Sequence, residues 1–214
     1  MLLAEAFVLL ALDPDGTLAR GQTNQSAAAV GVTGALVTEL VQGRHLTLDD
    51  GRINLTGTRS GHPLLDEVLD NLAHYEGKQL KRKLAAVKHS GWREVVDAMV
   101  AQGVLGREKR VLRPTHHPVA DQAAHAALLA EVRAAASTDG PLDERTAALL
   151  ALAGPCQMLE VVAPARADRA VAKRRIAEAT EQVPAAAAVK YVIAAMQSAA
   201  ATATVAGAGA AGAG

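Results

Sequence analysis

The stretch GHPLLDEVLDNL, from Gly61 to Leu72, decides the fold class of this chain. Its apolar residues recur at i, i+3, i+4 and i+7, a spacing that places them on one face of an α-helix: Leu65, Val68, Leu69 and Leu72. Acidic and amide side chains occupy the opposite face, and Pro63 opens the segment where a missing N–H does no harm. The stretch therefore predicts an amphipathic helix lying on a hydrophobic core.

The composition outside this helix points the same way. Hydrophobic residues make up 50% of the 214, yet the chain has only one Phe, one Trp and two Tyr. A core poor in aromatic residues has to be built from Ala, Leu and Val, and Ala and Leu are among the strongest helix formers. We therefore expect helices to dominate.

Hydrophobic periodicity, capping residues and Gly or Pro breaks predict further helices. They cover residues 2–12, 26–41, 79–89, 92–102, 121–136, 143–153, 165–179 and 184–201. Two short alternating runs around Asp50-Gly51 predict a β-hairpin over residues 45–55, and residues 104–112 suggest a second one.

These elements predict a mainly α fold in one domain. The expected architecture is a helical bundle core wrapped by amphipathic helices, with one or two short β-hairpins. No internal linker is long enough to divide the chain, so the domain is expected to span residues 1–203. The Ala/Gly tail from 204 to 214 is expected to be disordered.

Several function classes are disfavoured by the same inventory. Lys plus Arg equals Asp plus Glu at 22 each, whereas a general nucleic-acid binder is usually basic. The single cysteine, Cys156, rules out a disulfide framework and is expected to be a small buried residue. The apolar start of the chain lacks the basic residues of a secretory signal, and no run has the apolarity of a membrane span. We therefore expect a soluble cytoplasmic protein that meets a membrane, if at all, from its surface.

Catalytic and metal-binding patterns are scarce. The sequence has no phosphate loop, no nucleophile elbow and no His-Glu-x-x-His motif. His116, His117 and His125 could be imagined as zinc ligands, but their spacing favours surface or capping histidines. We expect no enzyme, no catalytic residue, no metal and no cofactor.

Charge is distributed unevenly. The segment from Lys78 to Arg93 carries cations and no acid: Lys78, Lys81, Arg82, Lys83, Lys88 and Arg93. The basic stretch continues to Arg113 with Arg107, Lys109, Arg110 and Arg113, among which only Glu108 is acidic. Such a basic face attracts anionic lipid, although an ordinary solvated helix face would also look like this. Trp92 lies within the stretch as either a core anchor or a membrane-interface residue, and its phase with Val95, Val96 and Met99 favours the core.

The motifs in their order resemble the Golgi phosphoprotein 3 family, in the shorter form found in bacteria. GHPLLDEVLDNL is similar to its Pro-Leu-Leu-Asp-Glu helix, and GALVTELVQGR (residues 34–44) to its second core helix and the following turn. VVDAMVAQGVLGREKRVL followed by THHPVAD resembles its helix, Gly-Val-Leu hairpin and His-Pro segment, and RTAALLALA (residues 145–153) its C-terminal core helix. The order and spacing agree over about residues 1–200.

This resemblance implies a peripheral membrane protein that binds anionic lipid headgroups. Members from eukaryotes bind phosphatidylinositol 4-phosphate and recognise the cytoplasmic tails of Golgi glycosyltransferases. The family's headgroup site uses a Trp before the second helix, a basic residue within that helix and two basic residues at i and i+3 before the fifth helix. In this chain the first two positions fall near Asn24 and Thr33, and the i, i+3 pair falls on His89 and Trp92, with Arg93 adjacent, so the family's residues are not kept there. The expected headgroup contacts in this chain are Arg82, Lys88, His89, Trp92 and Arg93.

Two other functions remain open from the sequence. The amphipathic surface helices could bind protein partners, which would make the chain an adaptor without a lipid role. The helices followed by a hairpin could also imitate a winged helix that binds nucleic acid. The segment 92–102 sets Arg93 against Glu94 and Asp97, however, and a recognition helix is usually basic or polar.

Overall fold

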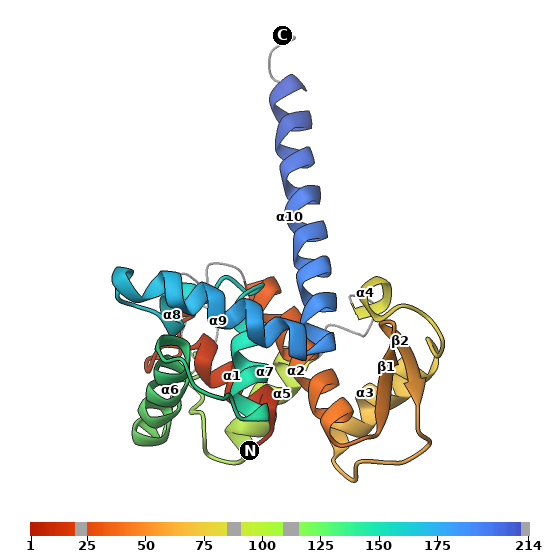
Figure 1. Ribbon diagram of the computed structural model, residues 1–214, viewed down its shortest axis with the longest axis horizontal. Coiled ribbons are helices and arrows are strands. Elements are labelled where there is room, and N and C mark those ends of the chain that lie inside the picture. The colour runs from red at the N-terminus through yellow and green to blue at the C-terminus, as the bar shows by residue number, and fades with distance from the viewer. Residues whose placement is uncertain (20–24, 85–90, 109–115, 211–214) are drawn as a thin grey trace.

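The computed structural model describes residues 1–19, 25–84, 91–108 and 116–210 and confirms a mainly α fold. Helix α1 (Leu3–Ala11) lies at the centre, and every one of its residues is buried. It packs against α2, α5, α6 and α7 (Figure 1). A helix that is apolar all round has no face suited to water, so its place is inside the bundle.

Helix α2 (Gln25–Gln42) packs tightly on both sides through glycines. A Cβ at Gly31 would lie 2.4 Å from Cζ of Phe7 in α1, and one at Gly34 would lie 2.3 Å from Cγ2 of Val189 in α10. Only glycine allows helices to approach this closely. These two contacts fix α1 and α10 (Pro184–Ala210) against α2.

The first predicted hairpin is confirmed. Strand β1 (Leu46–Asp49) pairs antiparallel with β2 (Arg52–Leu55), and Asp49 faces Arg52 across the turn. Asp50 and Gly51 both have positive φ, 48° and 72°, the conformation that a tight two-residue hairpin turn requires. This small sheet packs beside α3 (Pro63–Ala73), which buries the four apolar residues predicted for its inner face (Figure 1).

The second hairpin differs from its expected pairing. After α5 (Gly91–Ala101), Leu105 bridges Val119, and Glu108 bridges His116. The expected return strand at Val111 and Leu112 lies outside the described residues. The residues that pair with Leu105 and Glu108 therefore lie further along the sequence than expected.

Short and long helices complete the C-terminal half. Helix α6 (Gln122–Ser137) begins at an N-cap, Asp121, and α7 (Glu144–Ala153) at another, Asp143; both carboxylates accept from the first-turn backbone N–H groups. A one-turn helix, α8 (Leu159–Val162), was not predicted. The expected helix from 165 starts as a 3₁₀ turn, η2 (Arg166–Asp168), and continues as α9 (Arg169–Gln182).

Helix α10 is the feature that stands out from the body (Figure 1). Its first half packs on α2, α4 (Leu80–Lys83), α7 and α9, and its second half projects away from them. The structure carries the helix to Ala210, beyond the end expected near Ala201, because alanine is the strongest helix former. Residues 211–214 lie outside the described part, and the domain boundary at 203 with a disordered tail stays a prediction.

Candidate functional site

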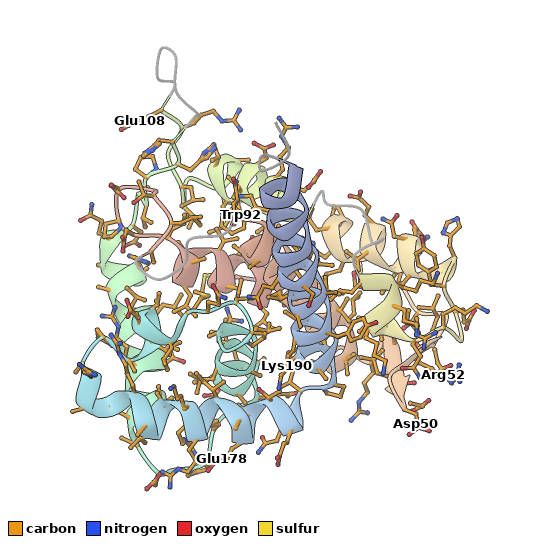
Figure 2. All side chains as sticks on the ribbon, turned by 90° about the horizontal axis from the view of Figure 1, so that it is seen from above. Asp50, Arg52, Trp92, Glu108, Glu178 and Lys190 are labelled. Carbon is orange, nitrogen blue, oxygen red and sulfur yellow. The ribbon has the colours of Figure 1, made fainter. Side chains whose placement is uncertain are left out.

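Two adjoining cavities form one open groove beside α10. One of about 520 Å³ lies between the start of α2, the start of α5 and the middle of α10. The other, of about 620 Å³, continues along α5 toward the segment that follows it. Gln25, Trp92 and Arg93 line both cavities, and Figure 2 shows Trp92 close beside α10. We call these two cavities together the Trp92 groove.

Two helix N-termini meet at the Trp92 groove. Helix α2 begins at Gln25, and α5 begins at Gly91, immediately before two of the lining residues. Gly91 lets the start of α5 pack on the third turn of α2, because a Cβ there would lie 3.3 Å from Oγ1 of Thr33. The first turn of a helix has unpaired N–H groups and the positive end of the macrodipole, so this convergence favours an anion.

Trp92 lies between the core and the groove. Its neighbours in phase, Val95, Val96 and Met99, are buried as predicted. The indole itself is only partly buried, packs against the core and lines the groove. Its position makes it a wall of the site as well as an anchor.

Two arginines and a histidine line the end of the groove away from α10, together with Asp97. Arg93 is exposed and makes no ion pair in the described part of the chain. Arg107 ion-pairs with Asp97, and both side chains are about half exposed. His117 completes the lining, with Nδ1 3.2 Å from the backbone oxygen of Gly106. One acid thus stands against two arginines and a histidine.

The position of His117 is set by a close backbone approach. Gly16, with φ of 81°, lies under this segment, and a Cβ there would be 2.5 Å from the backbone carbonyl of His117. The N–H of Val119 donates to the oxygen of Pro14 at 3.0 Å, and Nδ1 of His116 lies 3.1 Å from the oxygen of Asp15. The α1–α2 loop therefore supports one side of the groove.

The structure separates the predicted headgroup residues. Trp92 and Arg93 lie together in the groove, whereas Arg82 lies exposed on α4, which packs on another part of α10, and it lines neither cavity. Lys88 and His89 lie outside the described residues. The structure thus places two of the five predicted residues, Trp92 and Arg93, in one groove. Headgroup binding by any of the five stays a prediction.

The cations of α4 have aromatic partners. Nζ of Lys81 lies 5.9 Å from the ring centre of Tyr191, and Nζ of Lys83 lies 5.1 Å from that of Tyr75. Tyr191 is 49% exposed, and α4 and α10 are joined partly through this contact. The basic stretch is therefore divided between the face of α4 and the Trp92 groove.

Several groove residues were not identified as site residues from the sequence: Gln25, Arg107, His117, Val192 and Met196. Arg107 was visible only as one of many cations, and His117 only as half of a histidine pair. Val192 and Met196 follow Trp92 by about a hundred positions, and no local pattern links them to it.

The three histidines considered as zinc ligands serve separate backbone contacts. His125 is buried, with Nε2 3.0 Å from the oxygen of Leu9, and His116 and His117 contact Asp15 and Gly106. Among the described residues, no group of three or more His, Cys, Asp or Glu side chains could hold a metal ion. Cys156 is fully buried, as predicted, and burial raises the pKa of its thiol to about 12.

A second polar cluster lies elsewhere, around the first residues of the chain. Glu5 accepts from the N–H of Leu2 at 2.7 Å, and Glu39 accepts from that of Leu3 at 2.8 Å. The guanidinium of Arg145 donates to the oxygens of Met1 and Leu2, each at 3.3 Å. Burial raises the pKa of Glu39, against the opposing effects of the Leu3 N–H and Arg145. This cluster fixes the start of α1 and is separate from the groove.

Comparison with known proteins adds one finding. A family model described as Golgi phosphoprotein 3 (GPP34) matches residues 3–196, which include every lining residue of the Trp92 groove. The search of curated proteins finds no match. Within the described ranges, no helix combines the length and the apolarity needed to cross a membrane.

Proposed function

Because the chain belongs to the Golgi phosphoprotein 3 family, we propose that it is a peripheral membrane protein that binds anionic lipid headgroups in the Trp92 groove. The observation that carries the proposal is the convergence of two helix N-termini with Arg93 at an open groove. An anion there would gain from both macrodipoles and from Arg93, which forms no ion pair with an acidic side chain in the described part of the chain.

The chemistry of the groove favours a phosphate on a lipid headgroup. Arginine guanidinium groups present several donors to one phosphate, and helix N-termini add backbone N–H groups. Phosphatidylinositol 4-phosphate is the ligand we propose first, because its additional phosphate extends beyond the membrane surface. Arg82 and Lys88 are proposed to add attraction from α4 and the segment after it, and His89 and Trp92 to contact the headgroup.

The location we propose follows from this activity. The protein would act in the cytoplasm and associate with the cytoplasmic face of a membrane. The proposal is of binding, without catalysis and without a cofactor.

Vesicle co-sedimentation tests the proposal. The protein is mixed with neutral vesicles, with vesicles containing phosphatidylinositol and with vesicles containing phosphatidylinositol 4-phosphate, at low and moderate salt. We expect binding to the anionic vesicles that weakens with salt, since each basic residue near the surface contributes about 1 kcal/mol. A preference for the phosphoinositide would support the specific ligand.

Charge-reversal variants assign the surface. Arg93→Glu should reduce binding by about tenfold or more, because it removes one attraction of about 1 kcal/mol and adds a repulsion. Arg82→Glu and Lys88→Glu should reduce it less. Arg166→Glu is the matched control, because Arg166 is exposed in η2 and lines neither cavity.

The second candidate function is that of an adaptor that binds proteins and does not bind lipid. The projecting half of α10 favours it, because a helix that leaves the body offers a surface to a partner (Figure 1). Absence of binding to all three vesicle types would overturn the lipid proposal and leave this one. The nucleic-acid reading is weaker, since Asp97 on α5 is already paired with Arg107 and Glu94 lies on the same helix.

A further inference from the structure

The two cavities of the Trp92 groove differ in chemical character. The cavity along α5 is lined by Arg93, Arg107 and His117 together with one acid, Asp97, which pairs with Arg107. Arg93 leaves this cavity with a net positive charge, and we call it the cationic end. The cavity against α10 is lined mainly by apolar side chains: Ala29, Val30, Trp92, Val192 and Met196. Trp92 and Arg93 lie where the two join, so the groove has one end suited to an anion and one suited to hydrocarbon.

The apolar end is a built surface. Val192 and Met196 stand four residues apart on α10, so they lie on the same face of the helix, one turn from each other. Val30 of α2 forms the other wall, and Val30 and Val192 are 7% and 5% exposed. Met196 is partly buried, and its unbranched thioether adapts to different ligand shapes.

The size of this end exceeds what a headgroup needs. Its volume of about 520 Å³ is comparable with that of the cationic end, at about 620 Å³. A phosphate or an inositol ring would be hydrated and would gain nothing from contact with Val192 and Met196. An alkyl chain would gain there, because it leaves water on contact with apolar walls.

We infer that the groove binds a single-chain anionic amphiphile, with its phosphate at Arg93, Arg107 and His117 and its alkyl chain along Val192 and Met196. This inference rests on the proposed function for the anion and adds the ligand's hydrocarbon. The chemical class is an alkyl phosphate or a lysophospholipid, and one acyl chain lifted from a membrane lipid would present the same groups. Trp92 lies between the two halves of the ligand.

Trp92 also supplies the assay, because it is the only tryptophan in the chain. Its emission is followed while butyl, octyl and dodecyl phosphate are added below their micelle concentrations. Inorganic phosphate serves as the probe that has the anion without the alkyl chain, and octanol as the probe that has the alkyl chain without the anion. Affinity should rise by about fourfold for each methylene that becomes fully buried, and by less where burial is partial.

An uncharged substitution distinguishes binding of the alkyl chain from binding of the phosphate. Met196→Gln keeps the length and charge of the side chain but places an amide against the hydrocarbon. It should remove most of the dependence on chain length and leave the affinity for butyl phosphate within about twofold, because the cationic end is unchanged. Ala194→Gln is the control, since Ala194 is exposed on α10 and lines neither cavity, and it should behave as the unmodified protein does. Circular dichroism confirms that both variants fold.

The outcomes distinguish the inference from the function on which it rests. Equal affinity for all three alkyl phosphates would overturn the hydrocarbon site and keep the anion site. Equal affinity for octanol and octyl phosphate would overturn the anionic half of the ligand. In a third outcome, no alkyl phosphate binds, but anionic vesicles still bind the protein and Arg93→Glu abolishes that vesicle binding. This result would support membrane binding and overturn the inference.

Discussion

Replacing Gly34 with alanine should destabilise the protein through α10. A Cβ at this position would lie 2.3 Å from Cγ2 of Val189 and 3.1 Å from Cδ2 of Leu152. Val189 is fully buried and branched at Cβ, so it cannot rotate away at low cost. The clash falls on the contact between α2 and α10 that also forms the groove.

The magnitude follows from two opposing effects. Overpacking a closed core costs about 1–3 kcal/mol. Exchanging Gly for Ala inside a helix returns about 1 kcal/mol. The contact of 2.3 Å places the overpacking in the upper part of that range, at about 2–3 kcal/mol, so we expect Gly34→Ala to lower the free energy of unfolding by about 1–2 kcal/mol.

A double-mutant cycle tests this reasoning. Val189→Ala alone removes two buried methyl groups and should cost about 2 kcal/mol, since each is worth about 0.8 kcal/mol and a cavity remains. In the double variant the new methyl of residue 34 occupies that space, so the total loss should stay close to 2 kcal/mol instead of reaching about 3–4 kcal/mol. Urea unfolding monitored by circular dichroism gives all four values. Additive losses, or a Gly34→Ala variant as stable as the original, would refute the predicted close contact.

Four further predictions concern stability and reactivity. Burial raises the pKa of Glu39 above its value in the unfolded chain, so the contribution of Glu39 to stability is fully present below the unfolded pKa and is lost as pH rises through the folded pKa. In thermal unfolding, Glu39→Gln should therefore be more stable than the original protein at pH 7 and no more stable near pH 3. Arg175→Ala should cost about 2–3 kcal/mol, because the buried guanidinium donates to the oxygen of Gly140 at 2.6 Å and two further acceptors; a loss below 0.5 kcal/mol in urea unfolding, a level typical of surface changes, would contradict this. Asp143→Ala should cost about 1 kcal/mol through the lost N-cap of α7, whereas Asp143→Asn should retain most of it. Cys156 should resist alkylation at pH 8 in the folded protein and react in urea, because its thiol is buried with a pKa of about 12; rapid reaction without urea would show that the site opens.

Local patterns predicted much of the fold. The spacing in α3 identified the four residues that it buries, and the Asp-Gly pair identified the turn between β1 and β2. The helix starts expected at Asp121 and Asp143 are confirmed within a residue, because a capping carboxylate acts on the next few backbone N–H groups. In each case the stabilising partners lie within a few residues of each other.

Contacts between distant segments could not be predicted in this way. The one-turn helix α8 is too short to show a period, and the bridge from Leu105 to Val119 passes over a long intervening segment. The glycine contacts of α2 with Phe7 and Val189 are set by the approach of whole helices. A residue's spacing along its own helix carries no information about which other helix it meets.

The candidate site contains residues that a local pattern identified and residues that only the packing of distant segments brings together. Trp92 and Arg93 were identified from one basic stretch, and they lie together because they are neighbours in the first turn of α5. Arg82 belongs to the same stretch, yet it lies on α4 and lines neither cavity. The apolar wall from α10 joins the site only through the packing of α10 on α2.

The central claim is that the Trp92 groove is the surface that meets an anionic membrane. The most direct measurement is the emission of Trp92 during titration with vesicles containing phosphatidylinositol 4-phosphate, with neutral vesicles as the reference and Arg93→Glu and Arg166→Glu as the paired variants. The account predicts a saturable change in emission with the anionic vesicles alone, retained in Arg166→Glu and lost in Arg93→Glu. Binding of the anionic vesicles without any change in Trp92 emission, or equal binding by the two variants, would contradict it.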